Sequence, residues 1–485
     1  DNLLISSKRA SMWDENAFSE LYKLENFLQA WYPLAFAHDD VSLPENPGLT
    51  HLFAGILQIA DWLGSDTRFF SYCGLNGRPS ISCEDPIIFA RKAAQKAVKT
   101  IGFDVERIKI DEKDLPQFQE EFGFSPYPIQ TLIDKAPLSQ RGGLVIVEGE
   151  TGTGKTECAL RYFSRLFRAG LVDSLYFANP LRFAATELHY RVVEFVKRSF
   201  INHQKDLPTV LAVPGYIKVD EKEGVRLSGY EVLWPDIDDK RYMLRNWASE
   251  HPKRFLCAPL AVGTIDQAFL SVLRTPHAHL RSAALCRSLL VIDEVHSSDA
   301  YMSRLTESLV DLSRRIGGHI LLMSATLGGT TRQRYINVMR GDKNKWKERP
   351  SLEECLIKDY PLISTDKHFF NPGPSGFEKK VYFETFPHQS SPDLIAQKAA
   401  EIAKKGASVA IIRNTVSEAV KTQKALEEIF KKNEKLLFSI NGILTLHHSR
   451  FAPFDRKLLD LEIMKRFGKN ACNRRPGVVV GTQTL

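Results

Sequence analysis

The sequence predicts an α/β protein with two tandem parallel-sheet domains that follow an all-helical N-terminal segment. Two observations carry this prediction. Residues 15–72 have a helical pattern rich in aromatic side chains, whereas short apolar runs recur after the acidic stretch at 111–121. Runs this short, apolar throughout and alternating with helical stretches, are typical of strands buried on both faces of a parallel sheet. The runs, each with the polar or glycine-containing loop that follows it, are GGLVIVEGE, SLYFANP, SLLVIDEVH, GHILLMSAT, SVAIIRNT and GVVVGTQ.

Glycine and proline mark the boundaries between these parts. CGLNGRPSISCEDP at 73–86 predicts a loop, and residues 87–103 show an amphipathic helical pattern that ends at Gly102. NPGPSGF at 371–377 is typical of a hinge between two sheets. We therefore expect four segments: helical residues 1–75, a linker and helix at 76–110, the first α/β domain at 111–370 and the second at 371–485.

Composition excludes some classes of protein. Hydrophobic content of 43% and charged content of 25% describe a globular protein. No apolar run approaches the ~20 residues needed to cross a bilayer, and no signal-peptide pattern opens the chain. The seven cysteines are scattered without a CxxC pair, which suits a reducing compartment. We expect a cytoplasmic protein with no membrane partner, and the net charge of +7 permits a nucleic-acid partner without requiring one.

GETGTGKT at 149–156 matches the phosphate-loop pattern GxxxxGK[ST]. It directly follows the run LVIV and precedes a helical pattern, which is the context that this motif requires. Gly149, Gly152 and Gly154 let backbone N–H groups curl around a phosphate. Lys155 reaches the β- and γ-phosphate oxygens of ATP, and the Thr156 hydroxyl can hold Mg²⁺. The sequence therefore predicts an ATP site that uses magnesium.

Two further motifs follow the next apolar runs. DEVH places Asp293 to hold Mg²⁺ and Glu294 to orient and deprotonate the attacking water. In SAT, Ser324 and Thr326 can hydrogen-bond the acidic motif and relay the nucleotide state to the second domain. DEVH alone is a weak match, and a capping acidic pair is its simpler explanation. The ordered set of GETGTGKT, DEVH and SAT resembles the helicase core of superfamily two, which implies two RecA-like domains with Lys155, Asp293 and Glu294 as catalytic residues.

Other segments narrow this resemblance. FSPYPIQ ends in Gln130 and resembles a Q motif, whose glutamine recognises adenine. GTIDQAFLSVL begins thirty residues before Asp293, and GTIDQ together with HSRF and the following DR is far more specific than the phosphate loop. Together with IDEVHSSDAYM, LLMSATL, IIRNTVSEA (411–419), LHHSRFAPFDR (446–456) and FGK (467–469), it resembles the CRISPR-associated helicase–nuclease family of type I interference systems. ANPLRFAAT (178–186) resembles a DNA-contacting segment, but it differs from the threonine-rich version that is more usual in this family.

This resemblance implies an ATP-dependent translocase on single-stranded DNA, recruited by an RNA-guided surveillance complex to degrade foreign DNA. Arg182, Thr264 and Arg450 are the candidates for DNA backbone contact, since helicase channels grip phosphates. The family continues beyond VVVGTQTL into an arginine-bearing motif and carries more histidines upstream. We therefore expect the chain to be incomplete at both ends.

Asp61 is the one carboxylate inside an apolar helical pattern, GILQIADWLGSD. It shares a helix face with Leu57 and Ala54, the face that we expect to turn inward. In the family that the chain resembles, an ADW-like helix closes an HD nuclease domain, which implies that Asp61 binds a transition metal (iron, nickel, cobalt or manganese), with His38 as a further candidate ligand. We expect Asp61 to face a cavity near His38, or a segment that the chain lacks, and not sealed apolar packing. The alternative is a helix-packing carboxylate satisfied by local donors.

Two other functions stay open at this point. One is a generic superfamily two helicase that acts outside CRISPR. The other is an ATP-gated binding module that docks to a partner without turnover.

Overall fold

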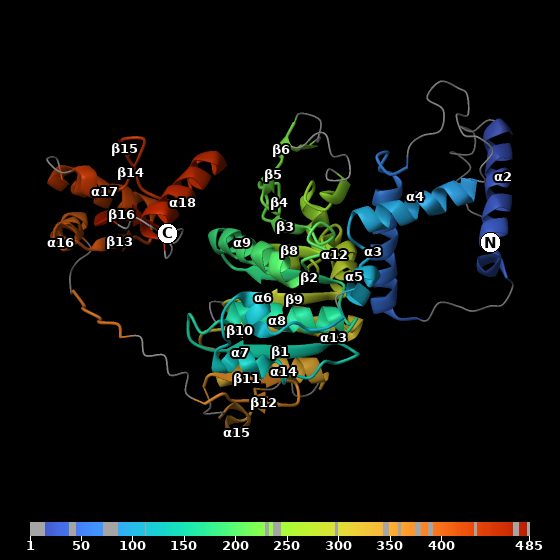
Figure 1. Cartoon of the computed structure of the whole chain (residues 1–485), viewed down its shortest axis with the longest axis horizontal. Coiled ribbons are helices and arrows are strands. Elements are labelled where there is room, and N and C mark those ends of the chain that lie inside the picture. The colour runs from blue at the N-terminus through green and yellow to red at the C-terminus, as the bar shows by residue number, and fades with distance from the viewer. Residues whose placement is uncertain are drawn as a thin grey trace.

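A ten-stranded sheet forms the centre of the molecule in the computed structural model (Figure 1). Helices α2–α4 lie toward one end, and the elements after residue 390 form a separate body at the other end (Figure 1). The structure describes residues 15–37, 45–70, 86–111, 113–227, 232–235, 244–295, 299–342, 349–356, 360–373, 380–386, 391–430, 434–468 and 475–482.

The N-terminal part is helical, as predicted. The long helix α4 ends two residues before Gly102, whose φ of +83° breaks the helix. The elements that precede the sheet are α2 (Glu15–Trp31), η1 (Pro33–Phe36), α3 (Pro47–Gly64), α4 (Pro86–Thr100), α5 (Glu106–Asp111), α6 (Phe118–Phe122) and α7 (Pro128–Ile133).

The sheet has the order β12-β11-β1-β10-β9-β2-β8-β3-β4-β5. The six central strands are parallel: β1, β10, β9, β2, β8 and β3. Antiparallel strands extend the sheet at both edges. The strands are β1 (Gly143–Glu148), β2 (Ser174–Asn179), β3 (Thr209–Ala212), β4 (Lys218–Val219), β5 (Lys222–Glu223), β8 (Leu260–Thr264), β9 (Ser288–Ile292), β10 (His319–Ser324), β11 (Leu362–Thr365) and β12 (Phe369–Phe370). A separate hairpin pairs β6 (Val225–Arg226) with β7 (Val232–Leu233).

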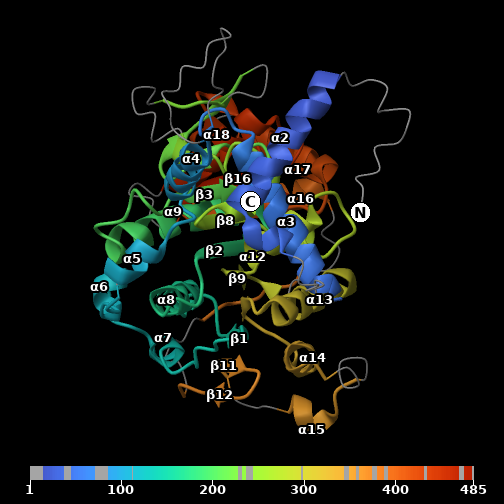
Figure 2. The same ribbon diagram turned by 90° about the vertical axis from the view of Figure 1, so that its right-hand side faces the viewer.

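Helices cover both faces of this sheet (Figure 2). Along β1, Leu144 and Ile146 enter one buried cluster, and Val145 and Val147 enter the other. A strand that is apolar on both faces needs cover on both sides, which explains the continuous apolar runs in the sequence. One face carries α8 (Lys155–Arg168) and α9 (Arg182–Ser199), and the other carries α11 (Ile265–Phe269), α12 (Ala278–Leu285), α13 (Ala300–Ile316) and α14 (Gly329–Arg340), with the short η2 (Pro252–Cys257) and α15 (Leu352–Cys355) at the periphery.

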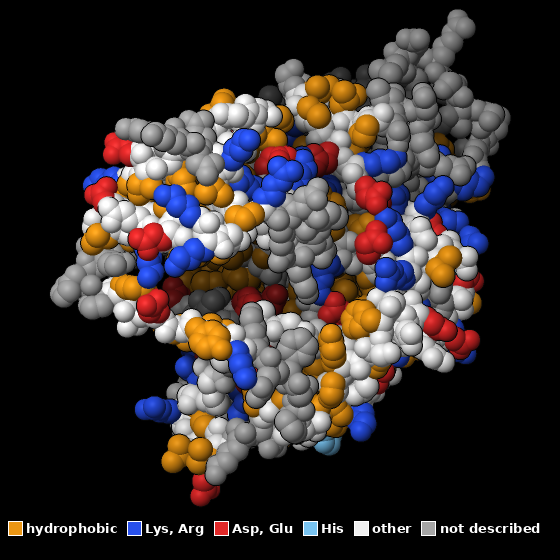
Figure 3. All heavy atoms as spheres, turned by 60° about the vertical axis from the view of Figure 1, so that its left-hand side comes forward, with side chains coloured by type: hydrophobic (Ala, Val, Ile, Leu, Met, Phe, Trp, Pro, Cys, Tyr) orange, Lys and Arg blue, Asp and Glu red, His pale blue; other side chains and the backbone are white. Residues whose placement is uncertain are grey.

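The C-terminal body has its own parallel strand pair. Ser408 pairs in register with Gly477, so SVAII and GVVVG lie side by side. The face of the molecule that carries this body is hollowed across its middle, and acidic and hydrophobic side chains lie in the hollow (Figure 3). The elements are α16 (Pro392–Lys404), β13 (Ser408–Ile412), α17 (Val416–Phe430), η4 (Glu434–Leu436), β14 (Ser439–Ile440), β15 (Ile443–Leu444), α18 (Pro453–Phe467) and β16 (Gly477–Gly481).

The predicted α/β class is confirmed, and all six predicted runs are parallel strands. Two central strands, β3 and β8, were not predicted, although β8 leads directly into GTIDQ. The predicted hinge at 371–377 lies between elements of the two sheets, and residues 374–377 fall outside the described part of the chain.

The prediction that the Asp61 face of its helix turns inward is wrong. Asp61 is exposed on α3, and Leu57 on the same face is 60% exposed. The opposite face packs on α12, because Gly55 lets the two helices approach closely: a Cβ there would stand 2.2 Å from the His279 carbonyl oxygen. Trp62, two helical turns further along that face, is packed against the same core.

In the described part of the chain, no helix is both long enough and apolar enough to span a membrane.

Candidate functional site

The GETGTGKT loop joins the end of β1 to the start of α8. Gly152 and Gly154 have φ of +95° and +84°, which favour glycine, and a Cβ on Gly154 would lie 1.9 Å from the Gln130 amide nitrogen. Lys155 is buried, and its Nζ donates to the carbonyl oxygens of Gly149 at 2.7 Å and Glu150 at 3.2 Å. Burial lowers the pKa of Lys155, and the carboxylates of Glu294 and Asp293 oppose that effect. The loop thus forms a cradle with one cation at its base.

Asp293 and Glu294 follow β9, two strands away from β1 at the same edge of the sheet. Burial and the neighbouring Glu294 raise the pKa of Asp293 to about 6. The Glu294 backbone N–H donates to Asp293 Oδ1 at 2.9 Å. Glu294 has φ of +53°, a left-handed conformation that costs a non-glycine residue about 1 kcal/mol or more. Two adjacent carboxylates opposite a buried lysine form a suitable site for a divalent cation. The charge of such a cation would favour the ionised forms of both carboxylates.

Asn179 is a member of this cluster that the sequence interpretation missed. Its Nδ2 donates to Asp293 Oδ2 at 3.3 Å, and its Oδ1 accepts from the Leu181 backbone N–H at 3.1 Å. Asn179 is buried at the end of β2, so it ties the ANPLR segment to the acidic motif. Its position directly after an apolar run, as for Asp293, is the signal that could have identified it.

Gln130 lies beside the phosphate loop, as a nucleotide role would require. It is fully buried, its Oε1 accepts from the Tyr127 backbone N–H at 2.8 Å, and its Nε2 donates to the Gly154 carbonyl at 3.2 Å. The structure therefore shows Gln130 holding the loop, and adenine recognition stays a prediction.

The other predicted nucleotide-site residues flank the same loop. Thr156 is half-buried in the first turn of α8. The Gly149 backbone N–H donates to the Ser324 carbonyl at 3.1 Å, which joins the loop to the SAT motif at the end of β10. Ser324 is buried and Thr326 is exposed.

The predicted DNA-contacting residues are divided between two bodies. Arg182 is exposed at the start of α9, and Thr264 lies at the end of β8, in register with Asn179 on β2. Thr264 is only 4% exposed, so its side chain presents little surface. Arg450 is exposed in the C-terminal body, where its backbone N–H donates to His448 Nδ1 at 3.3 Å. The structure brings Arg182 and Thr264 to the carboxyl edge of one sheet, and Arg450 lies in the C-terminal body.

The predicted metal site at Asp61 finds no partners in the described ranges. Across them, no three His, Cys, Asp or Glu side chains come together as metal ligands would. His38 lies outside the described residues. The described residues therefore do not complete a metal site around Asp61, and its metal-binding role stays a prediction.

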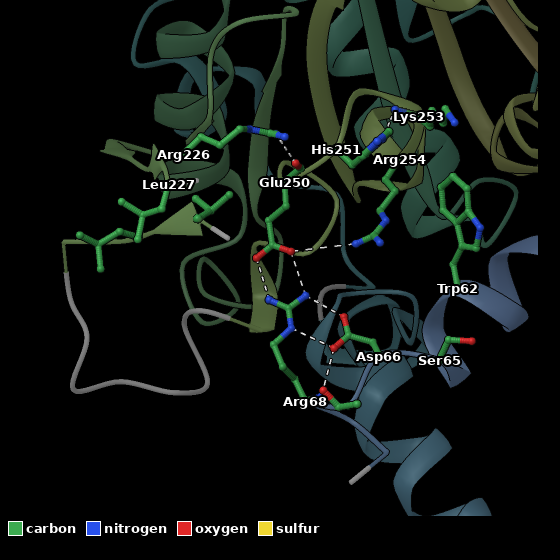
Figure 4. Close-up of a pocket in the computed structure, with 13 residues that line it drawn as sticks. Trp62, Ser65, Asp66, Arg68, Arg226, Leu227, Glu250, His251, Lys253 and Arg254 are labelled. Atoms are coloured by element: carbon green, nitrogen blue, oxygen red, sulfur yellow. Dashed lines mark hydrogen bonds and ion pairs between the residues drawn. The ribbon is translucent and has the colours of Figure 1, made fainter. Parts of the chain in front are cut away.

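A pocket of about 820 Å³ lies where the end of α3 meets η2 and the β6–β7 hairpin (Figure 4). Arg68 connects two sides of this pocket, the segment that follows α3 and the segment that precedes η2. Its guanidinium donates to both Asp66 carboxylate oxygens at 2.9 and 2.7 Å, and to both Glu250 oxygens at 2.8 Å. Asp66 and Glu250 are largely buried, and Arg68 is the nearer of two cations that stabilise their charges, since Arg254 lies 4.0 Å from Glu250.

Arg68→Met is expected to loosen the attachment of α3 to the α/β body. Removing the cation leaves two partly desolvated carboxylates, at a cost of about 1–2 kcal/mol after allowing for the exposure of Arg68. Native-state amide exchange of α3 reports this change directly. Arg107→Met, which removes an exposed ion pair at 3.6 Å, is the matched control and is expected to leave α3 unchanged. Equal exchange rates in both variants would refute a role for Arg68 in the attachment.

Comparison with known proteins adds to this geometry. The family described as CRISPR-associated nuclease/helicase Cas3, C-terminal, matches residues 405–485. The Cas3 endonuclease/helicase of Thermus thermophilus is 32% identical over 88% of this chain and 48% of its own length, and that of Escherichia coli K12 is 27% identical over 90% and 48%. The crystal structure of T. fusca Cas3-ATP has a TM-score of 0.63 at 24% identity, covering 90% of this chain and 49% of the other.

The parallel sheet, with a phosphate loop after β1 and an acidic pair after β9, has the fold of the RecA-like domains of helicases. The predicted family is confirmed as well: the chain is related to the Cas3 nuclease/helicases of CRISPR systems. It spans about half the length of the curated relatives that it matches.

Proposed function

We propose that this chain is the ATP-hydrolysing motor of a Cas3-type helicase–nuclease that moves along single-stranded DNA. The observation that carries the proposal is the convergence of Lys155, Asp293 and Glu294 at the carboxyl edge of one parallel sheet. Phosphoryl transfer needs positioned charge more than covalent chemistry, and this edge supplies one cation and two carboxylates on rigid strands.

Each residue of the site has a proposed task in ATP hydrolysis. The Gly149–Gly154 backbone and Lys155 bind the phosphates, and Gln130 contacts the adenine. Glu294 orients the attacking water and takes its proton. Magnesium, when bound, would be held by Thr156 and Asp293 and would stabilise charge on the phosphates. Ser324 and Thr326 pass the nucleotide state on toward the second domain.

The remaining proposals rest on the similarity of the chain to the Cas3 family. Residues 111–370 and 371–485 are the two RecA-like domains, and Arg182, Thr264 and Arg450 contact the DNA backbone. Residues 1–75 are the C-terminal part of an HD nuclease domain, with Asp61 and His38 as ligands of its metal, and 76–110 is a linker. A related structure is described as a CRISPR RNA-guided surveillance complex, pre-nicking, which supports such a complex as the recruiting partner.

ATPase activity of the full-length protein, with and without single-stranded DNA, tests this proposal. We expect hydrolysis that rises about 10-fold or more with single-stranded DNA, which corresponds to an activation free energy lowered by about 1.4 kcal/mol or more. Duplex DNA and RNA of the same length and sequence are the controls, and a generic RNA helicase would respond to RNA instead. Nucleotide binding without any hydrolysis would identify an ATP-gated binding module and refute the motor.

A further inference from the structure

Glu148 is a buried carboxylate that stands directly before the phosphate loop. It is the last residue of β1 and is only 3% exposed. No role in binding phosphate or magnesium falls to it, because the loop begins at the next residue. A buried carboxylate is costly unless it is paired, so its partners indicate what it does.

Both partners of Glu148 lie in the segment that follows the SAT motif. Its Oε2 accepts from Arg332 Nη1 at 2.9 Å, and its carboxylate also accepts a hydrogen bond from the Leu327 backbone N–H. Arg332 is in the first turn of α14 and is 4% exposed. One side chain therefore holds both the loop after β10 and the helix after that loop. We call residues 324–332 the relay segment.

Arg332 depends on this one carboxylate for its position. Within the described residues, its Nε and Nη2 are buried and have no hydrogen-bond partner. A buried ion pair is weak evidence for stability, because desolvation offsets most of its Coulombic gain. A buried arginine with a single partner is therefore better explained by the arrangement that it enforces than by the stability that it adds.

The phosphate loop and the relay segment are also joined through the backbone. Glu148 is in register with Ser324 across β1 and β10, and the Gly149 N–H donates to the Ser324 carbonyl at 3.1 Å. The backbone contact fixes the start of the relay segment, and the Glu148 side chain fixes its middle at Leu327 and its end at Arg332. A shift of the loop at Gly149 would therefore displace all three points together.

We infer that Glu148 is a positioning residue that makes the relay segment follow the phosphate loop, so that the nucleotide state reaches α14. The inference rests on the proposed ATP-driven function. Glu148 contacts no reacting atom and acts through Leu327 and Arg332.

Glu148→Gln tests this role, because it keeps the side-chain shape and removes the charge that holds Arg332. We expect the DNA-stimulated kcat for ATP hydrolysis to fall about 10-fold, while the KM for ATP stays within about twofold. We also expect the amides of the relay segment to lose the change in hydrogen exchange that ATP binding causes in the wild-type protein. A merely structural residue would not remove that nucleotide-dependent difference.

Glu307→Gln is the matched control. Glu307 is also a buried carboxylate, and it pairs with another arginine of α14, since Arg334 Nε lies 3.1 Å from Glu307 Oε1. It lies on α13, and its partner Arg334 is in α14, so this pair does not include a residue next to the phosphate loop in the chain. We expect Glu307→Gln to keep both the stimulated kcat and the exchange response.

Four outcomes decide the inference. Wild-type behaviour of Glu148→Gln in both measurements overturns it, and so does a loss of ATP binding in this variant. An equal loss in Glu307→Gln also overturns it. A wild-type protein that neither binds nor hydrolyses ATP refutes the proposed function instead.

A second variant covers the case in which Glu148→Gln does not fold. Glu148→Leu with Arg332→Leu removes both buried charges, a replacement that is often neutral for stability. We expect this double variant to fold and bind ATP with the same loss of DNA stimulation. Wild-type stimulation in the double variant would overturn the inference.

Discussion

Lys155→Ala is expected to lower ATP hydrolysis by about 10²–10³-fold, the usual loss when one preorganised electrostatic contact to the transition state is removed. Lys155 is the buried cation at the base of the phosphate loop, and its ammonium group already lies 2.7 Å from the Gly149 carbonyl. In the variant, water that enters the space left by the lysine side chain cannot replace a charge held in a low-dielectric site. The variant should also bind ATP more weakly, because the lysine contacts phosphate in the ground state as well.

Steady-state ATPase assays and titration with a fluorescent ATP analogue measure the two effects of Lys155→Ala. Lys99→Ala, an exposed lysine near the end of α4, is the control and should leave both unchanged. Hydrolysis by Lys155→Ala within about threefold of wild type would exclude GETGTGKT as the catalytic phosphate loop.

Glu294→Gln should separate binding from turnover. The amide keeps the size of the side chain but cannot take a proton from water, so hydrolysis should fall about 10²–10⁴-fold. Binding of the ATP analogue should stay within about threefold, because Lys155 and the loop backbone remain. Glu401→Gln, exposed on α16, is the control. Wild-type turnover in Glu294→Gln would refute its role as the base.

The sequence predicts the centre of the fold well and its edges poorly, for a physical reason. Runs such as LVIV are apolar on both faces because both faces are covered, and the pattern carries this information locally. The edge strands β4, β5 and β12 have two residues each, too short for a pattern to emerge.

The parts of the site that the sequence does not predict depend on contacts between residues far apart in the chain. The partners Glu148 and Arg332 are 184 residues apart, and Asn179 is 114 residues from Asp293. No local pattern marks such pairs, whereas the phosphate loop is contiguous and could be identified from its spacing.

Asp61 illustrates a different limit. Helical periodicity shows which residues share a face, but it does not show which face packs against the rest of the protein. Periodicity therefore predicts that the apolar face of Leu57 turns inward, whereas in the structure Gly55 on the other face allows the close approach of α12.

The sheet order also has a consequence for synthesis on the ribosome. β1 lies between β10 and β11, so neither neighbour exists until residues 319–324 and 362–365 have been made. At about 5–20 residues per second, β1, which is apolar from Leu144 to Val147, waits roughly 10–40 seconds for both partners. A nascent chain that stalls in this interval holds a strand with two open edges, which is prone to aggregate. The nucleotide site is thus among the last parts of this body to be completed, and we expect its assembly to depend on chaperones that shield β1 during translation.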